Sequence, residues 1–257
     1  MLIVFDVGNT ETTVGLFRGE ELVAHWRLMT ESARTPDEIG VLLHGLLQAA
    51  GEDAGRISAA AIGSVVPPVT SPLARACQTY LRVNPIIVDA RSPLPITLDV
   101  EEPLTVGADR LINTLAASRL YGRDTICVDL GTATTFDCIT GDGVFLGGVI
   151  MPGVHTSAET LTRRTSKLPA TELIPPSRAI GKRTEECIRA GVIFGAAEAI
   201  DGICRRIKRE WPRANVPWVV ATGGLAETLQ PLCTEFDRVE PFLTLEGLRI
   251  AHSLLSA

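Results

Sequence analysis

Apolar residues recur at helical spacing in the segment 36–50. They stand at Ile39, Leu42, Leu43, Leu46 and Leu47, with other residues between them. Side chains three or four positions apart share one face of an α-helix, so this pattern predicts an amphipathic helix. Two more helices are predicted at 108–120 and, with a sequence rich in Ala and Gly, at 185–208.

Apolar runs that lead into Asp-x-Gly occur twice. Residues 4–14 read VFDVGNTETTV and residues 127–137 read CVDLGTATTFD. In each, the glycine turn is followed by small hydroxyl residues and a second apolar run, which is typical of a β-hairpin. An ungapped alignment pairs Asp6 with Asp129, Gly8 with Gly131, and Thr12 with Thr135.

A second pair of similar segments occurs, one member following each hairpin further along the chain. Residues 59–66 (AAAIGSVV) and 218–225 (WVVATGGL) read as buried strands ending in small residues, which suit the inner strands of a helix-covered sheet. The repeated order predicts an α/β protein of two duplicated lobes, each a mixed sheet with flanking helices, with a cleft between them. We place the lobes at 1–121 and 122–257 and expect the helix 108–120 to connect them. The alternative is one α/β domain in which Asp-x-Gly recurs by chance.

Composition narrows the class of protein. Of 257 residues, 46% are hydrophobic and 21% are charged, which excludes a disordered chain, and the net charge of -6 without a basic run disfavours nucleic-acid binding. The six cysteines show no C-x-x-C spacing, and the chain has neither a signal-peptide pattern nor 18 consecutive apolar residues. We therefore expect a reduced, cytoplasmic protein that contacts no membrane.

The first Asp-x-Gly loop has the composition of a phosphate-binding turn. Gly8 lets the backbone bend sharply and approach a ligand. Backbone N–H groups, with the side chains of Asn9, Thr10, Thr12 and Thr13, can donate to phosphate oxygens. A carboxylate at a strand end, Asp6, suits Mg²⁺ held through water. An ordinary hairpin remains the alternative.

The second loop, 129–135 (DLGTATT), repeats this device. Two such loops facing each other would hold a nucleoside triphosphate without the G-x-x-x-x-G-K-[ST] loop, which is absent from the chain. Phosphoryl transfer needs mainly positioning and charge neutralisation, which two loops and a cation can supply.

The segment Gly107-Ala108-Asp109-Arg110 begins a predicted helix. Asp109 can accept a proton from a substrate hydroxyl, and Arg110 can hold a carboxylate or phosphate. Helix capping with a surface ion pair is an equally good interpretation. Three further segments carry weaker signals. The glycines of 147–153 indicate a close backbone approach to a ligand or another strand. Thr184 in 181–184 is interpreted as a helix N-cap, and 222–224 is either a structural turn or a contact to an adenine or ribose.

Taken in order, these motifs resemble one family over essentially the whole chain. They are DVGNT at 6–10, SVVPPV at 64–69, VGADR at 106–110, DLGTATT at 129–135, GGVIMPG at 147–153, KLP at 167–169, GKRT at 181–184, TGGLA at 222–226 and PFLTLEGL at 241–248. The series resembles the type III pantothenate kinases, of the acetate and sugar kinase/Hsp70/actin superfamily. The resemblance implies actin-like, ribonuclease-H-like lobes and phosphorylation of pantothenate by ATP in the first step of coenzyme A biosynthesis.

The resemblance also implies roles for individual residues. The catalytic base would be Asp109. Pantothenate would contact Gly107, Ala108, Asp109, Arg110 and Thr184. ATP would contact Asp6, Val7, Gly8, Asn9, Thr10, Glu11, Thr12, Thr13 and Thr132. Asp129 would bind a monovalent cation, K⁺ or NH₄⁺, Mg²⁺ would accompany ATP, and the enzyme would be a homodimer.

The chain departs from the family pattern at three places. Val100 stands where a tyrosine is common, Arg183 replaces an asparagine, and Glu11 follows DVGNT. None of these changes removes a proposed catalytic residue. Two other hypotheses stay open at this stage, a superfamily kinase acting on a sugar or short carboxylic acid, and a non-catalytic regulator built on the kinase fold.

Overall fold

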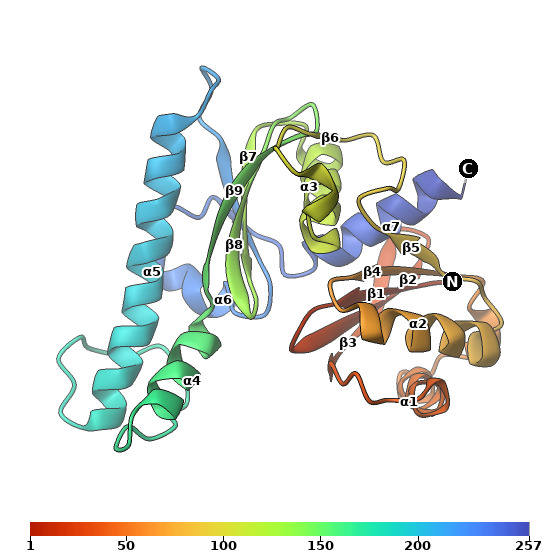
Figure 1. Cartoon of the computed structure of the whole chain (residues 1–257), viewed down its shortest axis with the longest axis horizontal. Helices are drawn as coiled ribbons and strands as arrows, with labels where there is room; N and C mark the ends of the chain where they lie inside the picture. The colour runs from red at the N-terminus through yellow and green to blue at the C-terminus, as the bar shows by residue number, and fades with distance from the viewer. Residues whose placement is uncertain (257) are drawn as a thin grey trace. The chain divides into compact units, whose positions relative to one another are not determined.

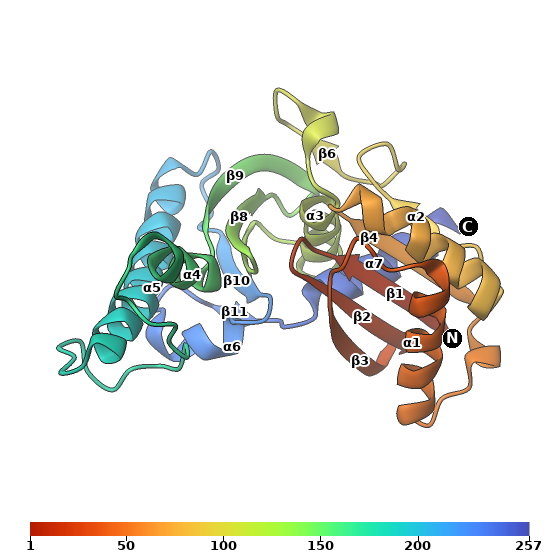
Figure 2. The same cartoon turned by 60° about the horizontal axis from the view of Figure 1, so that its bottom comes forward.

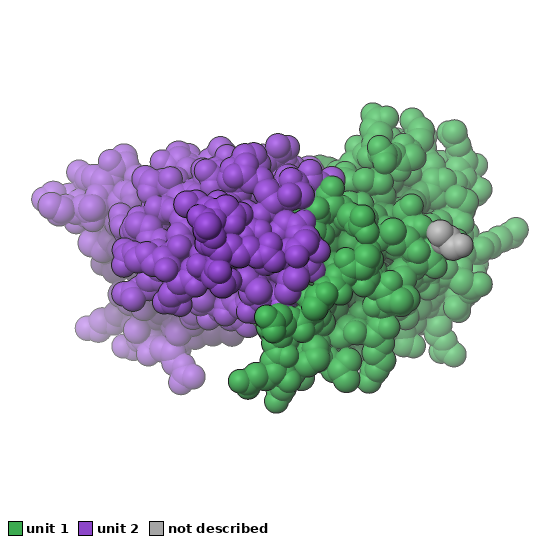
Figure 3. Space-filling model, turned by 90° about the horizontal axis from the view of Figure 1, so that it is seen from above, with its two compact units in different colours: residues 1–119, 243–257 green, residues 120–242 purple. Residues whose placement is uncertain are grey.

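A computed structural model describes residues 1–256 of the chain. Two compact units form, coloured separately in Figure 3: residues 1–119 with 243–257, and residues 120–242. The division falls near the end of α3 (Ala108–Tyr121), within two residues of the predicted boundary.

Unit 1 contains a five-stranded sheet in the order β3-β2-β1-β4-β5 (Figure 1). Its strands are β1 (Leu2–Val7), β2 (Glu11–Arg18), β3 (Glu21–Met29), β4 (Ala59–Ser64) and β5 (Ile86–Val88). The unit also holds α1 (Pro36–Ala49), α2 (Pro67–Ala76), α7 (Leu243–Leu255), β6 (Thr97–Leu98) and the short helical segments η1 (Ala54–Arg56), η2 (Cys77–Leu81) and η3 (Pro103–Thr105).

Helices cover both faces of this sheet. On one face, alternate residues of β1 and β2, such as Phe5 and Leu16, form a core with Leu43 of α1 and Leu73 of α2, and Figure 2 shows these two helices together on that side. The other face packs against α7, which contacts β1, β2 and β4. Alternation along a strand makes this possible, because successive side chains point to opposite faces.

Unit 2 contains five strands in the order β9-β8-β7-β10-β11. They are β7 (Thr125–Leu130), β8 (Ala133–Ile139), β9 (Val144–Pro152), β10 (Trp218–Thr222) and β11 (Arg238–Val239). Its helical segments are α4 (Val154–Arg164), α5 (Thr184–Glu210), α6 (Ala226–Leu229) and η4 (Gln230–Leu232). Inward residues of the strands, including Val128 and Phe136, pack on Ile193 and Ile200 of α5.

The two sheets share one topology, which confirms the predicted duplicated α/β fold. In unit 1, β1 pairs antiparallel with β2 and parallel with β4. In unit 2, β7 pairs antiparallel with β8 and parallel with β10. Each pair of similar sequence segments therefore marks the same strand of a repeated sheet.

One helix lies in a different unit from the one expected. The predicted lobes 1–121 and 122–257 put the C-terminal helix in the second lobe, whereas α7 belongs to unit 1. Packing explains the difference, because Leu245 and Leu248 of α7 reach the glycine positions Gly15 and Gly63 of the first sheet. The spacing of apolar residues predicts that a segment is helical, but it does not show on which earlier unit the helix packs.

The three predicted helices are confirmed as α1, α3 and α5, with ends within two residues of those expected. The start of α1 illustrates why: Thr35 and Glu38 form a reciprocal capping box, and Pro36 occupies the first turn. Among the described residues, no helix is long and apolar enough to cross a membrane.

Candidate functional site

The first Asp-x-Gly loop joins β1 to β2 at the carboxyl end of β1. The Gly8 amide donates to the Glu11 carbonyl over 3.0 Å, which closes a tight turn. Asn9 and Thr10 at its tip are exposed, and Asp6 at its base is half-buried. Ligands of open α/β sheets bind at the carboxyl ends of strands, so the loop is in the expected place for a ligand contact.

Strand register separates the two threonines that follow this loop. Asp6 lies opposite Thr13 on β2, so their side chains share one face of the sheet. Thr12 points to the other face, where it is 7% exposed and its hydroxyl lies 2.9 Å from the hydroxyl of Thr30. Only Thr13 of the two is therefore on the side of Asp6.

The second loop is tighter by one residue. Here the Gly131 amide donates to the Ala133 carbonyl over 3.1 Å, and Asp129 lies opposite Thr135. Thr135 thus corresponds to Thr13, not to Thr12 as the ungapped alignment implies. That alignment was wrong by one position after the turn, because a shortened turn shifts the register of the returning strand.

Glycine at 153 allows a close backbone approach to the second loop, whereas the sequence predicted an approach to a ligand or another strand for the segment 147–153. A methyl group on Gly153 would lie 2.4 Å from the carbonyl oxygens of both Gly131 and Thr132. The Thr132 carbonyl accepts hydrogen bonds from the Gly153 amide (3.1 Å) and the Thr156 hydroxyl (2.6 Å). Thr132 itself is exposed at the loop tip, so the start of α4 supports the loop from behind.

Gly223, in the third glycine segment, has a structural role. It adopts a φ of +87°, and a methyl group there would lie 2.6 Å from Oδ1 of Asp129 and 2.8 Å from the Leu130 amide nitrogen. Both the left-handed conformation and the crowding favour glycine. Of the two interpretations left open, the structural turn is the one with contacts to support it.

Asp109 stands in the first turn of α3 in a desolvated environment. Its Oδ1 accepts a hydrogen bond from the Arg110 amide over 2.8 Å. Burial raises the pKa of Asp109 above its ordinary value, with the Arg110 amide and charge opposing that shift. A carboxyl group with a raised pKa is a better proton acceptor than an exposed aspartate.

Gly107 leaves space for this carboxyl group within unit 1. A methyl group on Gly107 would lie 2.6 Å from Asp109 Oδ1 and 3.3 Å from a Val65 methyl carbon. Val65 follows β4, and its amide donates to the Val7 carbonyl over 3.0 Å. Val65 therefore links the first loop to the Gly107–Arg110 segment, a role that the SVVPPV motif alone did not reveal.

Glu11, a departure from the family pattern, is paired. Its carboxylate accepts a hydrogen bond from Arg27 Nε on β3 over 3.0 Å, and the same guanidinium forms an ion pair with it. This pairing offsets a negative charge beside a loop proposed to hold phosphates.

Thr184 is exposed and is the first residue of α5. The interpretation of Thr184 as N-cap was wrong, because the cap is Arg183, which makes no side-chain cap hydrogen bond. Glu186 organises the preceding turn instead. Its carboxylate accepts from the Lys182 amide (2.8 Å) and Arg178 (2.9 Å), and the pKa of Glu186 is accordingly lowered.

The carboxylates beside the two loops suit a metal ion that binds together with a phosphate-bearing substrate. No group of three or more His, Cys, Asp or Glu residues within 1–256 could hold a metal ion. The half-buried carboxylates Asp6 and Asp129 each end a strand beside a phosphate-type loop. Mg²⁺ prefers oxygen ligands, keeps several waters and binds through one or two carboxylates plus substrate phosphates, so these residues fit it.

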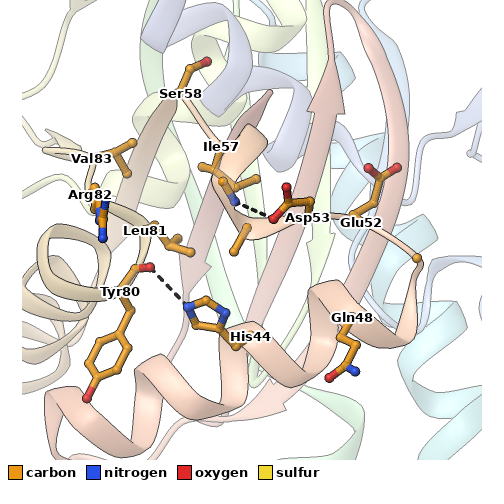
Figure 4. A pocket seen from close by; sticks show the side chains of 13 residues that line it. His44, Gln48, Glu52, Asp53, Ile57, Ser58, Tyr80, Leu81, Arg82 and Val83 are labelled. Atoms are coloured by element: carbon orange, nitrogen blue, oxygen red, sulfur yellow. Dashed lines mark hydrogen bonds between the residues drawn. The ribbon is translucent and has the colours of Figure 1, made fainter.

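A large surface cavity, of about 830 Å³, lies elsewhere in unit 1 (Figure 4). It is lined by α1, the 51–58 segment and residues 80–83, at the amino end of β4, whereas the first loop follows the carboxyl end of the parallel strand β1. Two of its polar side chains are engaged in the fold: His44 Nε2 lies 3.2 Å from the Tyr80 carbonyl, and Asp53 accepts from the Gly55 amide. None of the predicted site residues lines it.

The comparisons with known proteins identify one family. The family model described as "Type III pantothenate kinase" matches residues 2–206. A "Type III pantothenate kinase" of Roseiflexus sp. (strain RS-1) is 44% identical over 254 residues, covering 99% of both chains.

Solved structures share the fold at lower identity. A "conserved putative Baf family transcriptional activator" from Campylobacter jejuni has a TM-score of 0.60 at 17% identity, covering 98% of both chains. A "Putative N-acetylglucosamine Kinase" from Porphyromonas gingivalis has a TM-score of 0.52 at 14% identity, covering 100% of both chains. At these identities the likeness supports the fold alone.

Proposed function

The chain belongs to the type III pantothenate kinase family, and we propose that within it Asp109 is the base that accepts the proton of the pantothenate hydroxyl. Enzymes of this family phosphorylate pantothenate at the expense of ATP, the first step of coenzyme A biosynthesis. The observation that carries the assignment is the position of Asp109: a half-buried, partly desolvated carboxyl with a raised pKa, next to Gly107 and to Val65, whose amide donates to Val7 of the first loop.

The proposed reaction is a direct in-line transfer without a phosphoenzyme. The pantothenate hydroxyl oxygen forms a bond to the γ-phosphorus of ATP, the bond from that phosphorus to the β–γ bridging oxygen breaks, and ADP leaves. Asp109 orients the hydroxyl and takes its proton. The Arg110 amide, bound to Oδ1, holds the carboxyl in place for this step.

The phosphates of ATP are assigned to the two loops. Residues 6–13 would hold them in unit 1, through the backbone amide of Asn9 and the side chain of Thr13, and Thr132 would do so in unit 2. Mg²⁺ would be held by Asp6 and by the phosphates themselves, and it supplies neutralisation of phosphate charge. Loop amides also face the phosphates, and because they are already oriented they stabilise the developing charge without reorganising.

Pantothenate carries a carboxylate as well as the reacting hydroxyl. Arg110 is next to the base and has the planar donor fork that binds carboxylates, so we assign it to that group. Gly107, Ala108 and Thr184 complete the proposed pantothenate contacts. We also propose that the enzyme is cytoplasmic and that it is a homodimer. Sedimentation of the purified enzyme would test the dimer.

Asp129 is proposed to bind a monovalent cation. It lies near the end of β7 beside an exposed loop, and a methyl group on Gly223 would lie 2.6 Å from its Oδ1. We expect higher turnover in K⁺ or NH₄⁺ buffer than in Na⁺ buffer, because the smaller Na⁺ ion would not fill the same set of oxygen ligands. Initial rates at equal ionic strength check this, and equal rates in the three salts would refute the assignment.

Gly107→Ala is expected to lower turnover by up to about 10²-fold, the cost of a misplaced catalytic group, with little loss of stability. The added methyl group would overlap Asp109 Oδ1 at 2.6 Å, and a side-chain end can move away. Turnover and thermal unfolding are measured together. Gly45→Ala on α1, which meets no atom within 4 Å, is the matched control, and unchanged turnover in Gly107→Ala would contradict the placement of the base.

The defining experiment measures ADP release with MgATP in K⁺ buffer, with and without pantothenate. Pantothenate-dependent release that is lost in Asp109→Asn establishes both the reaction and the base. Pantothenate-dependent release that persists in that variant keeps the family's reaction and rejects the base.

A further inference from the structure

Thr30 contacts the first loop through three hydrogen-bonding positions. It follows β3 directly. Its amide donates to the Thr10 carbonyl over 2.9 Å, its hydroxyl donates to the Gly8 carbonyl over 2.8 Å, and the same hydroxyl lies 2.9 Å from the Thr12 hydroxyl. No motif in the sequence pointed to this residue.

The protons of the two hydroxyls can be assigned. A threonine hydroxyl carries one proton and accepts through its lone pairs. Because Thr30 gives its proton to Gly8, Thr12 must be the donor between the two hydroxyls. Thr12 is also 7% exposed, so its hydroxyl acts on the loop through Thr30 rather than on a phosphate.

The Gly8 carbonyl determines the direction of the next amide. In a trans peptide, the carbonyl of one residue and the N–H of the next point opposite ways. Holding the Gly8 oxygen toward Thr30 therefore aims the Asn9 N–H away from Thr30. On the Thr30 side, a pocket of about 30 Å³ is lined by core residues, including Phe5 and Leu28. Asn9 itself is exposed.

We propose that Thr30 is a positioning residue that directs the Asn9 N–H toward a phosphate oxygen of ATP. This inference rests on the proposed function of the first loop. A merely structural Thr30 would close the end of β3, and its loss would affect stability and both substrates alike. A positioning Thr30 affects ATP selectively.

The test compares Thr30→Val, which keeps the branched shape but removes the hydroxyl, with Thr30→Ser, which keeps the hydroxyl. We expect Thr30→Val to raise the KM for ATP about tenfold, the weight of one hydrogen bond, with the KM for pantothenate unchanged. Thr30→Ser should retain the wild-type KM for ATP. An unchanged KM for ATP in Thr30→Val, a parallel rise in both KM values, or failure of Thr30→Ser to rescue would each overturn the proposal.

Two further variants keep the test decisive. Thr30→Ala removes the same hydroxyl that donates to the Gly8 carbonyl; if Thr30→Val does not fold, an unchanged KM for ATP in Thr30→Ala overturns the proposal and a selective rise supports it. Gly8→Ala alters the loop itself, where a methyl group would lie 3.0 Å from the Glu11 carbonyl. If Gly8→Ala changes the KM for ATP and Thr30→Val does not, Thr30 alone is misassigned. If neither does, the first loop is not the phosphate site.

Discussion

Asp109→Asn is expected to lower turnover by about 10²–10⁴-fold, the usual contribution of a general base. Asparagine keeps an oxygen that can accept the Arg110 amide hydrogen bond of 2.8 Å, so the geometry is retained while basicity is lost. Single-turnover and steady-state rates with MgATP and pantothenate in K⁺ buffer measure the effect.

The pH dependence separates a lost base from a damaged fold. The base must be ionised, so kcat/KM of the wild type should rise with pH through the raised pKa of Asp109 and then level off. This acid limb should lie above the range of an exposed aspartate and should disappear in Asp109→Asn.

The stability of Asp109→Asn should not fall with its turnover. A folded-state pKa above the unfolded one means that ionised Asp109 opposes folding as pH rises, so the asparagine variant should be at least as stable at neutral pH. A folded variant with wild-type turnover would remove Asp109 from the mechanism.

Gly153→Ala is expected to lower turnover by about 10²-fold, as does a catalytic contact displaced by about 1 Å, and stability by about 1–3 kcal/mol, the cost of overpacking. A methyl group there would meet the carbonyl oxygens of Gly131 and Thr132 at 2.4 Å. Backbone atoms cannot rotate away as a side chain can, so the second loop must shift. Steady-state kinetics with varied ATP, and urea denaturation, measure the two effects.

Gly202→Ala on α5 is the matched control for this variant. Its methyl group would meet no atom within 4 Å, and alanine is favoured over glycine in a helix interior, so stability should rise slightly. Wild-type kinetics in Gly153→Ala would show that the second loop does not hold ATP in the position proposed. A stability loss without a kinetic effect would assign Gly153 to folding alone.

Local pattern determined much of the fold. The spacing of Ile39, Leu43 and Leu47 predicted α1, and the two Asp-x-Gly segments predicted hairpins that the structure contains at β1–β2 and β7–β8. These signals are readable because helix and strand periodicity depend on neighbours a few residues away. The family's motifs, in order along the chain, identified the same reaction as the comparisons.

Which threonine faces Asp6 required the strand register. Thr12 and Thr13 look equivalent in the sequence, and the ungapped alignment paired Thr12 with Thr135. A one-residue difference between the two turns places Thr13 opposite Asp6 and buries Thr12 beside Thr30. Strand side chains alternate between faces, so a single-residue shift exchanges a possible ligand contact for a buried one.

The sequence by itself therefore determined the fold class, the family and the segments that carry its chemistry, because these depend on short-range periodicity and residue order. Only the tertiary structure decided that α7 covers the first sheet, that Gly153 makes room for the second loop, and that Thr30 supports the first. Each of these contacts joins residues at least 20 positions apart along the chain, as the pairs Gly8–Thr30 and Thr132–Gly153 illustrate. Such contacts are set by close packing and hydrogen-bond satisfaction in three dimensions, which no local pattern encodes.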